Sequence, residues 1–522
     1  MYIFMMCSSG GGWLPDLGTH LTPLLAIMLY SVSNLRARWR MPAVVLLGLL
    51  PLAGLRAQTS SYTQIRSGES YSVALRADGT LWAWGNNPFG QLGNGGTIGR
   101  TLPAQVAAPA AAAAGTTWTD MATGAAHQLA RRSDATLWGW GSNFYGQLGD
   151  GTTTNRVLPV LIPVPVGAAA GTTWGAVATG FSTLALRSDG TLWSWGNNAQ
   201  GQLGSGTTTP RSSAGPVAAP AGAPAASTWT AVAVGYSHAL ALRSDGSLWT
   251  WGDNTYGQLG DNSTTSRPLP TRVNAPAAAP AGTTWTAITA GEYHSLGLRS
   301  DGTLWAWGFN NYGQLGNGTT TTNSLVPVAV ITPGTVGAGT TWTQVSAGFA
   351  TATALRSDGS LWAWGRNDIG QLGNNTIIDQ STPTRETTNG VWSQLSASRS
   401  NTLAIQAGTG LVFGTGSNTF GQLGTGTTTN TRIFAASAAP VLATRSAAAP
   451  LTGVYPNPAT ASCQLPALPL GAVVTLRDLH GRLVRKTPAA PTLSLVGLAP
   501  GLYLLVAQAP GVAPRTMRLA VE

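Results

Sequence analysis

Three histidines are the first residues in this chain that could do chemistry, and each stands in a short pattern, Gly-x-x-His. They are His127, His238 and His294. Imidazole acts as a general base or a metal ligand when other polar groups converge on it. Each of these histidines belongs to a different copy of a repeat. We therefore expect them to be spread apart in the fold and to make structural hydrogen bonds.

The aspartates fall into two groups, and neither group predicts a metal site. Five precede Gly between two apolar runs, where Asp-Gly favours a tight hairpin turn. Asp150 and Asp261 stand in Thr-rich loops and could touch Ca²⁺, but one carboxylate per loop is poor ligation. The chain also has no zinc-ligand spacing and no Ser/His/Asp order. We expect no catalytic residue, no metal and no cofactor.

Tryptophan is abundant, and 18 of the 20 in the chain occupy fixed positions in the repeat. Twelve lie in Leu-Trp-x-Trp-Gly, and six open a short apolar run ahead of it. Aromatic side chains in fixed register are typical of packing between repeated units. We favour packing over ligand stacking or light sensing.

All these residues are positioned by one stretch of sequence that occurs seven times. Its form is Leu137-Trp-Gly-Trp-Gly-Ser-Asn-Phe-Tyr-Gly-Gln-Leu-Gly149, and neighbouring copies are 51–57 residues apart. Apolar runs around Asp-Gly predict a β-hairpin, and Leu-Trp-x-Trp-Gly is apolar at both strand parities. A sheet covered on both faces fits that pattern, and radial stacking of small sheets provides the cover. The period predicts a repeat architecture.

The motifs resemble the regulator of chromosome condensation (RCC) repeat family. Gly-x-x-His, Leu-x-Leu-Arg-Ser-Asp-Gly, Trp-Gly-x-Asn and Gly-Gln-Leu-Gly follow one another in this order over residues 58–438. The resemblance implies an all-β protein with a seven-bladed β-propeller. Light-sensing members of the family carry Trp directly after the Gly of Gly-x-x-His. This chain has no Trp there, so light sensing is not expected.

A short Pro-x-x-Val-like segment precedes most of the Trp-opened runs, as at 103–106 and 270–273. The first copy lacks such a segment, and a spare one follows the seventh copy at 431–436. We expect the spare segment to pair with the first blade, because a closed ring has no open sheet edges.

The net charge of +10 is spread unevenly along the 522 residues. Residues 58–435 carry 17 Arg against 15 acidic residues, so the repeat region is nearly neutral. A nucleic-acid-binding face normally shows a concentrated basic footprint. We therefore expect no nucleic-acid partner. The chain has two cysteines, Cys7 and Cys463, and we expect no disulfide because Cys7 precedes the cleavage point described next.

Residues 35–57 have the layout of a secretory signal peptide. Three arginines precede an apolar run at 43–55, and Ala57 is a small residue at the expected cleavage point. The apolar run is too short for a comfortable bilayer crossing, so no stable membrane span is expected. The part ahead of it does not fit the pattern, and Met41 is an alternative start. We assign 1–57 to an upstream extension and the signal peptide.

An Ala/Pro-rich linker at 439–452 leads into a C-terminal segment, 453–522. It contains Val454-Tyr-Pro-Asn-Pro458, Gly481-Arg-Leu-Val484 and Leu498-Ala-Pro-Gly-Leu-Tyr503. These motifs resemble the C-terminal sorting domain of the type IX secretion system of Bacteroidetes. The resemblance implies a small β-sandwich, contact with the type IX machinery, and a mature protein that is secreted or attached to the outer-membrane surface.

The two residues after the Gly of Gly-x-x-His vary more than their neighbours do. The pairs are Glu69-Ser70, Ala125-Ala126, Phe181-Ser182, Tyr236-Ser237, Glu292-Tyr293, Phe349-Ala350 and Arg399-Ser400. Buried positions tolerate changes of volume badly, so the variation indicates exposure on a common rim or face. In a light-sensing relative the matching positions meet a partner subunit, and aromatic and Arg side chains are frequent interface anchors. We predict a partner-binding site formed by Glu69, Phe181, Tyr236, Glu292, Tyr293, Phe349 and Arg399, with an ordinary solvated loop as the alternative.

Three functions compete. We favour a secreted or cell-surface protein-binding module that is not an enzyme, because a rigid disc with varied loops suits recognition of an extracellular protein. The alternative is an extracellular hydrolase or lyase that acts on a polymer at the propeller channel. Such a site would need convergent polar groups from several blades, and no such set is evident. Nucleotide exchange on a Ran-like GTPase would need a compartment that the signal peptide argues against.

Overall fold

The computed structural model describes residues 61–334, 339–438, 461–465, 472–478, 482–488, 490–508 and 515–521. Every regular element in these segments is a β-strand. In this part of the chain no helix is long and apolar enough to cross a membrane. The predicted signal region at 1–57 and the predicted linker at 439–452 lie outside the described residues.

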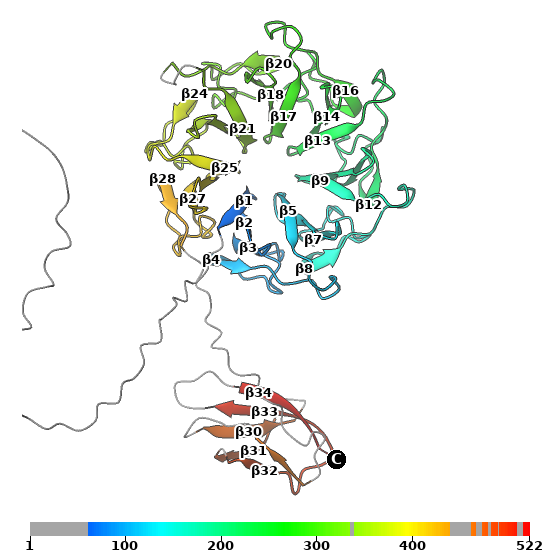
Figure 1. Ribbon diagram of the computed structural model, residues 1–522, viewed down its shortest axis with the longest axis vertical. Helices are drawn as coiled ribbons and strands as arrows, with labels where there is room; N and C mark the ends of the chain where they lie inside the picture. Colours follow the sequence, from blue (N-terminus) through cyan, green and yellow to red (C-terminus); the bar gives the residue numbers. More distant parts are fainter. Residues whose placement is uncertain are drawn as a thin grey trace, which may run out of the picture. The chain divides into compact units, whose positions relative to one another are not determined.

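Seven four-stranded antiparallel sheets surround a central axis as the blades of a propeller (Figure 1). The innermost strands are β1 (Tyr62–Ser67), β5 (Trp118–Thr123), β9 (Trp174–Thr179), β13 (Trp229–Val234), β17 (Trp285–Ala290), β21 (Trp342–Ala347) and β25 (Trp392–Ala397). The second strands are β2 (Tyr71–Arg76), β6 (His127–Arg132), β10 (Ser182–Arg187), β14 (His238–Arg243), β18 (His294–Arg299), β22 (Thr351–Arg356) and β26 (Asn401–Gln406). The third strands are β3 (Leu81–Gly85), β7 (Leu137–Gly141), β11 (Leu192–Gly196), β15 (Leu248–Gly252), β19 (Leu304–Gly308), β23 (Leu361–Gly365) and β27 (Val412–Gly416). The outer strands are β4 (Arg100–Gln105), β8 (Arg156–Leu161), β12 (Arg211–Pro216), β16 (Arg267–Arg272), β20 (Ser324–Ala329), β24 (Gln380–Arg385) and β28 (Thr431–Ala436).

Each blade is one continuous segment, and its antiparallel strands place the connections alternately on the two faces of the disc. The Gly-x-x turns, such as 68–70, and the Gly-Gln-Leu-Gly loops, such as 86–99, share one face, which we call the front face. The Asp-Gly hairpins and the Ala/Pro-rich connections between blades, such as 106–117, share the other, the back face. The residues predicted to bind a partner therefore all belong to the front face.

The hairpin motif on the back face is fixed by a short chain of hydrogen bonds. Gly246 has φ 74°, and the preceding Asp245 accepts from the backbone N–H of Ser247 at 3.0 Å. The hydroxyl of Ser247 accepts in turn from Nε1 of Trp249 at 2.9 Å. In the second blade, Ala135 replaces the Gly and still adopts φ 62°. An L-residue is strained in this left-handed region.

Neighbouring blades are joined by their tryptophans. The second Trp of each Leu-Trp-x-Trp-Gly is fully buried, and Nε1 of Trp195 donates to the carbonyl of Gln147 in the preceding blade at 2.9 Å. The same bond is made by Trp84, Trp140, Trp251, Trp307 and Trp364. We call this repeated contact the Trp–Gln seam. The prediction that the repeated tryptophans pack between blades is confirmed.

The seventh blade fills the same space with a different residue. Thr415 replaces the second Trp, and its hydroxyl donates to the carbonyl of Gly370 at 2.8 Å. In other blades the last Gly of the preceding Gly-Gln-Leu-Gly lies against this Trp, whereas Gly373 lies against Phe434 of β28. The ring of Phe434 is buried 5.1 Å from that of Trp392. An aromatic side chain from the outer strand thus replaces the missing indole.

The predicted ring closure is wrong. β28 pairs with β27 of its own blade, with Thr431 opposite Gly416 and Ala436 opposite Phe413. The first blade is completed by β4, which follows its hairpin instead of preceding it. The ring closes through the same seam as the other blades, because Nε1 of Trp84 donates to the carbonyl of Gln422 at 2.9 Å.

The C-terminal strands form two further sheets around one apolar core. β29 (Ser462–Gln464) pairs with β32 (Thr492–Ser494). β31 (Leu483–Pro488), β30 (Val473–Arg477), β33 (Gly501–Gln508) and β34 (Arg515–Val521) form the second sheet, in that order. Cys463, Val474, Leu476, Leu493 and Leu505 belong to the buried core between them. This arrangement agrees with the expected all-β fold and small C-terminal sandwich.

Candidate functional site at the mouth of the central channel

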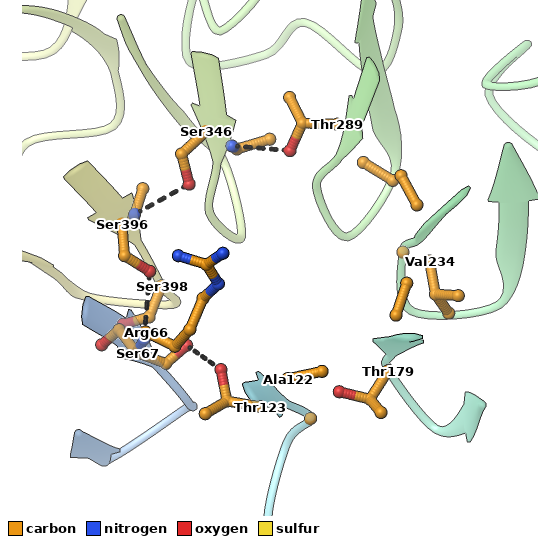
Figure 2. Close-up of a pocket in the computed structure, with 18 of the residues that line it drawn as sticks. Arg66, Ser67, Ala122, Thr123, Thr179, Val234, Thr289, Ser346, Ser396 and Ser398 are labelled. Carbon is orange, nitrogen blue, oxygen red and sulfur yellow. Dashed lines mark hydrogen bonds between the residues drawn. The ribbon is translucent and has the colours of Figure 1, made fainter. Parts of the chain in front are cut away.

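The inner strands of all seven blades line a central cavity of about 470 Å³ (Figure 2). Its wall differs between two arcs of the ring. Thr289, Ser346 and Ser396 each accept a backbone N–H of the next blade, at 3.2, 3.0 and 3.0 Å. The matching positions of the second, third and fourth blades are alanines, whose side chains cannot accept a hydrogen bond, although Thr123 and Thr179 also line this arc.

Arg66 occupies the matching position of the first blade, and its half-buried side chain extends into the channel (Figure 2). One guanidinium nitrogen donates to the carbonyl of Ile65 at 2.9 Å. Burial lowers the pKa of Arg66, and the charge of Asp120 raises it again. The channel therefore holds one guanidinium group and one carboxylate, Arg66 and Asp120, below its mouth.

The predicted partner-binding residues lie around the channel mouth. Six of the seven line the cavity, and Tyr293 is the exception. Arg399 is exposed and the other six are half-buried. The expected common rim is thus present.

Aromatic rings at the mouth contact one another across blade boundaries. The centroids of Phe181 and Tyr236 are 4.4 Å apart, and those of Tyr236 and Tyr293 are 5.9 Å apart. These residues come from the Gly-x-x turns of the third, fourth and fifth blades. Their distances fall in the range of favourable aromatic pairs.

The loops after Trp-Gly extend this surface with aromatic residues that the sequence analysis missed. The ring of Tyr256 lies 5.2 Å from Tyr293 and 4.9 Å from Phe309. Phe309 lies 6.2 Å from Tyr312. The sequence could have indicated part of this surface, because the residue that follows Trp-Gly varies while its neighbours are nearly fixed. The seven residues at this position are Asn86, Ser142, Asn197, Asp253, Phe309, Arg366 and Ser417.

Arginines complete the surface on the sixth and seventh blades. The guanidinium carbon of Arg366 lies 5.5 Å from the Tyr312 ring centroid and 5.9 Å from that of Phe349. Arg399 lies 4.5 Å from the Phe349 centroid and 3.5 Å from the carboxylate of Glu69. We call this connected set the aromatic arc: Phe181, Tyr236, Tyr256, Tyr293, Phe309, Tyr312, Phe349, Arg366 and Arg399.

Two members of the predicted variable pairs, Ser182 and Ala350, are buried and do not line the mouth. Ser182 is buried and begins β10, where it lies opposite Gly196, as His238 lies opposite Gly252 in the next blade. The turn of the third blade is one residue shorter than the others, so only Phe181 remains in it. The prediction that both residues of a pair are exposed is therefore wrong for Phe181-Ser182 and for Phe349-Ala350.

Glu292 has the most perturbed carboxyl group at the mouth. Burial raises its pKa to about 7, while the Tyr293 hydroxyl and the charge of Arg399 act in the opposite direction. The pKa of Tyr293 is raised to about 12 by burial and by Glu292. The mouth thus combines a carboxylate that is poorly solvated with phenol rings.

The three repeated histidines are buried between blades and do not reach this site. Burial lowers their pKa values to about 3 for His127, about 4 for His238 and about 3 for His294, so all are neutral. Nε2 of His238 lies 2.9 Å from the hydroxyl of Ser295 in the next blade. Nε2 of His127 lies 3.5 Å from the hydroxyl of Thr183 in the next blade, whereas neither ring nitrogen of His294 has a hydrogen-bond partner among the described residues. The expected hydrogen bonds between blades are therefore confirmed for His127 and His238 and wrong for His294.

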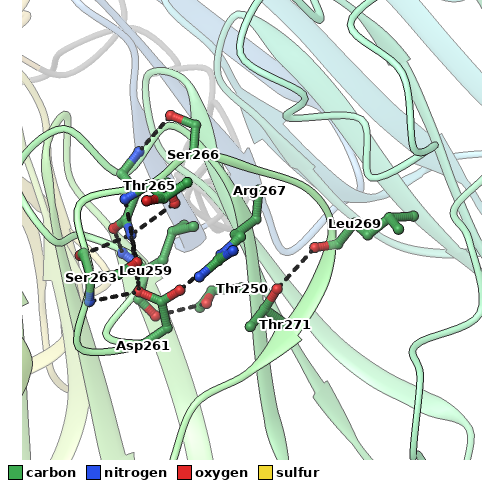
Figure 3. Close-up of polar contacts among 10 residues, drawn as sticks. Thr250, Leu259, Asp261, Ser263, Thr265, Ser266, Arg267, Leu269 and Thr271 are labelled. Atoms are coloured by element: carbon green, nitrogen blue, oxygen red, sulfur yellow. Dashed lines mark hydrogen bonds and ion pairs between the residues drawn. The ribbon is translucent and has the colours of Figure 1, made fainter.

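The Thr-rich loops considered for Ca²⁺ use their carboxylates internally (Figure 3). Asp261 accepts from Asn254 at 3.0 Å and pairs with Arg267 at 3.0 Å. Asp150 pairs with Arg156 at 2.8 Å in the same way. In the segments that the structure describes, no three His, Cys, Asp or Glu side chains gather as a metal site would need.

Comparison with known families and proteins covers the repeat region. The RCC1-like domain family matches over residues 46–274 and again over 175–451. The ultraviolet-B receptor UVR8 of Arabidopsis thaliana is 32% identical over 368 residues, which span 69% of this chain and 78% of the receptor. The human E3 ubiquitin-protein ligase HERC2 is 30% identical over 283 residues, which are only 6% of that ligase.

Solved structures show the same fold at lower identity. Prp20p of Saccharomyces cerevisiae, described with its binding to Gsp1p and histones, superimposes with a TM-score of 0.59 at 20% identity, over 73% of this chain and 88% of that one. Human WBSCR16 gives 0.58 at 24% identity, over 66% and 87%. These similarities establish the propeller and not a shared partner.

Proposed function

This chain belongs to the RCC1-like domain family, and from that premise we propose that its propeller is a protein-binding module acting outside the cell or on its surface. The names of its relatives point to receptors and to proteins that bind other proteins. The third function considered, nucleotide exchange, has no support beyond the shared fold. The proposed partner is an extracellular or cell-surface protein.

The aromatic arc is the observation that carries this proposal. Its side chains follow one another in contact across five blades of the front face, while the frame beneath them repeats. Tyr, Phe and Arg in partly desolvated clusters are typical anchors of protein interfaces. A surface of this kind favours protein recognition over an isolated solvated loop.

A capture experiment tests the binding function. Mature protein would be used to capture partners from its native environment, in parallel with a variant in which Phe181, Tyr236, Tyr293 and Phe349 are changed to Ser. We expect the variant to lose the partner while keeping its melting temperature. Phe144→Ser is the matched control, because Phe144 is an exposed aromatic on the front face outside the arc. If the variant with all four substitutions captures the partner as well as the wild type does, the aromatic arc is not the binding surface.

Export through the type IX system is the second part of the proposal. It is supported by the signal-like segment at 35–57 and by the sorting-like motifs in 453–522. Mass spectrometry of culture medium and outer membranes should find peptides from 58 to about 440 and few from 453–522. Full-length protein confined to the cytoplasm would contradict the route and the location together.

We propose a binding role without catalysis or nucleic acid. Six of the propeller's arginines are held in the back-face motif, as Arg243 is 4.9 Å from the Trp229 ring, and they are not free to form a basic patch. The cavity keeps an extracellular hydrolase or lyase as the competing function. Turnover of a polymer substrate by purified protein, abolished by Glu292→Gln, would favour that alternative.

A further inference from the structure

Five charged side chains line the channel and its mouth: Arg66, Glu69, Asp120, Glu292 and Arg399. Four of them balance. Arg399 lies 3.5 Å from Glu69, and Asp120 supports the charge of Arg66. The lining therefore holds three carboxylates against two guanidinium groups. Glu292 is in no ion pair within 61–334 and 339–438, although the charge of Arg399 still acts on it.

The turn that carries Glu292 is held firmly. The N–H of Glu292 donates to the carbonyl of Phe349 in the next blade at 3.3 Å, and the N–H of Gly291 donates to the carbonyl of His294 at 2.8 Å. A Cβ on Gly291 would approach the carbonyl of Gly348 to 2.5 Å. A binding group on such a turn is positioned before its ligand arrives.

Aromatic rings stand beside this carboxylate. Tyr293 is the next residue of the same turn, and its ring lies 5.9 Å from that of Tyr236, which lines the cavity together with Glu292. The faces of such rings attract ammonium and guanidinium groups. A carboxylate among ring faces suits a cation, whereas an anion or an apolar group would leave the carboxylate desolvated and unpaired.

We propose that Glu292, Tyr236 and Tyr293 form a recognition site for a Lys or Arg side chain that a separate partner protein inserts into the channel mouth. The inference rests on the binding function proposed above and specifies the chemistry of its partner. The charge balance of the channel selects a cation, and the cavity of about 470 Å³ gives a long side chain room to enter.

Protonation of Glu292 gives this site a distinctive signature. Burial raises the pKa of its carboxyl to about 7, Tyr293 and Arg399 lower it, and Glu69 raises it. The pKa of the Tyr236 hydroxyl is raised by burial and by the charges of Glu292 and Glu69, while Arg399 lowers it. A bound cation favours the ionised carboxylate and lowers its pKa. Binding should therefore release a proton near neutrality and strengthen as pH increases through 7.

The test uses the full chain and a small probe, Nα-acetyl-arginine methylamide, with the uncharged citrulline analogue as its isostere. Calorimetric titration at pH 6 and pH 8 should show affinity for the arginine probe about tenfold higher at pH 8, as the ionised fraction of a group with a pKa near 7 requires. The citrulline analogue should not saturate the site. Arginine binding that is independent of pH would overturn the proposal.

Variants separate this site from the charge of the surface as a whole. Glu292→Gln should weaken the arginine probe about tenfold at pH 8 and remove the pH dependence. Asp368→Asn is the matched control, because Asp368 is a front-face carboxylate that already pairs with Arg366 at 2.6 Å, and it should bind as the wild type does. Equal probe binding by Glu292→Gln and wild type would overturn the proposal.

Partner capture distinguishes the failure of this inference from the failure of the binding function. A partner retained equally by Glu292→Gln and wild type, but lost by the fourfold aromatic variant, would overturn the cation site and leave the binding function in place. Dimerisation of the chain that Glu292→Gln abolishes would overturn the assignment to a separate partner, because the cation would then come from a second copy.

Discussion

Trp195 and Trp251 occupy the same place in neighbouring blades, both fully buried and both bonded to a Gln carbonyl at 2.9 Å. At the channel mouth of the same two blades, Phe181 and Tyr236 also match in position, yet they differ in type and are half-buried. Inside the blades, close packing allows few side chains to fill each space. At the mouth the side chains are only half-buried, so contacts with the next blade restrict their volume less. The frame thus limits variation in the interior and permits it where a partner could bind.

The largest expected effect comes from removing an interior aromatic. Trp251→Ala should lower the free energy of unfolding by about 3–5 kcal/mol, because it leaves a large cavity and removes one bond of the Trp–Gln seam. Tyr236→Ala, in the same blade but at the mouth, should cost less than about 1 kcal/mol. Urea unfolding of both variants measures the difference, and equal losses would remove the distinction between interior and mouth.

The seventh blade tests whether the interior requires a particular residue or only a filled volume. Phe434→Pro restores the residue that most other outer strands carry at this position, and it should cost about 3 kcal/mol because Thr415 cannot fill the space. Adding Thr415→Trp should recover most of that loss. A double variant as unstable as the sum of both single variants would show that the two positions do not compensate.

At the mouth, the effect of pH on stability should be moderate and have a defined sign. The pKa of Glu292 is raised from 4.5 to about 7 in the folded protein, so the unfolded chain loses this proton first. Its stabilising contribution is complete below pH 4.5 and is lost as pH rises toward 7. Glu292→Gln should therefore flatten the change in melting temperature between pH 5 and pH 7. A wild-type profile that rises over that range because of this residue would contradict the assignment.

The smallest effect concerns one turn on the back face. Ala135→Gly should stabilise the protein by about 0.5–1 kcal/mol, since relief of left-handed strain exceeds the added freedom of the unfolded chain. The matching turns already carry Gly, with φ 75° at Gly79 and 76° at Gly190. Gly190→Ala is the mirror-image control and should destabilise. A loss of stability in Ala135→Gly would mean that the turn is not strained.

These differences also explain how far the sequence could predict the structure. The hairpins and the Trp positions were predictable because Asp-Gly and Leu-Trp-x-Trp-Gly act locally and repeat. The sequence could not predict which blade each outer strand belongs to. The strands follow one another around the ring in the same order whether 431–436 is the last strand of the seventh blade or the first strand of the first blade. Only the pairing of Thr431 with Gly416 decides between the two.

The site was predicted in part for a similar reason. Glu69, Phe181 and Arg399 could be found because they vary within one motif. Tyr256 and Phe309 come from a different motif, and their contact with Tyr293 depends on how neighbouring blades lie against each other. The one-residue shortening at Ser182 was hidden because the residue types around it still fit the pattern.

The Trp–Gln seam runs in one sense around the ring, except between the sixth and seventh blades, where the Thr415 hydroxyl donates to the carbonyl of Gly370. The bond between Trp84 and Gln422 is the same as those between other blades that are consecutive in the chain. Each blade is formed by four consecutive strands, so the ring closes without a strand from one end of the chain joining a blade at the other end. Circular permutation at any back-face connection, with the present ends of the disc joined by a short linker, should yield the same disc. By the same logic, whole blades are exchangeable units, so a mouth with a new order of side chains can arise by shuffling segments of about 55 residues, as their spacing of 51–57 implies.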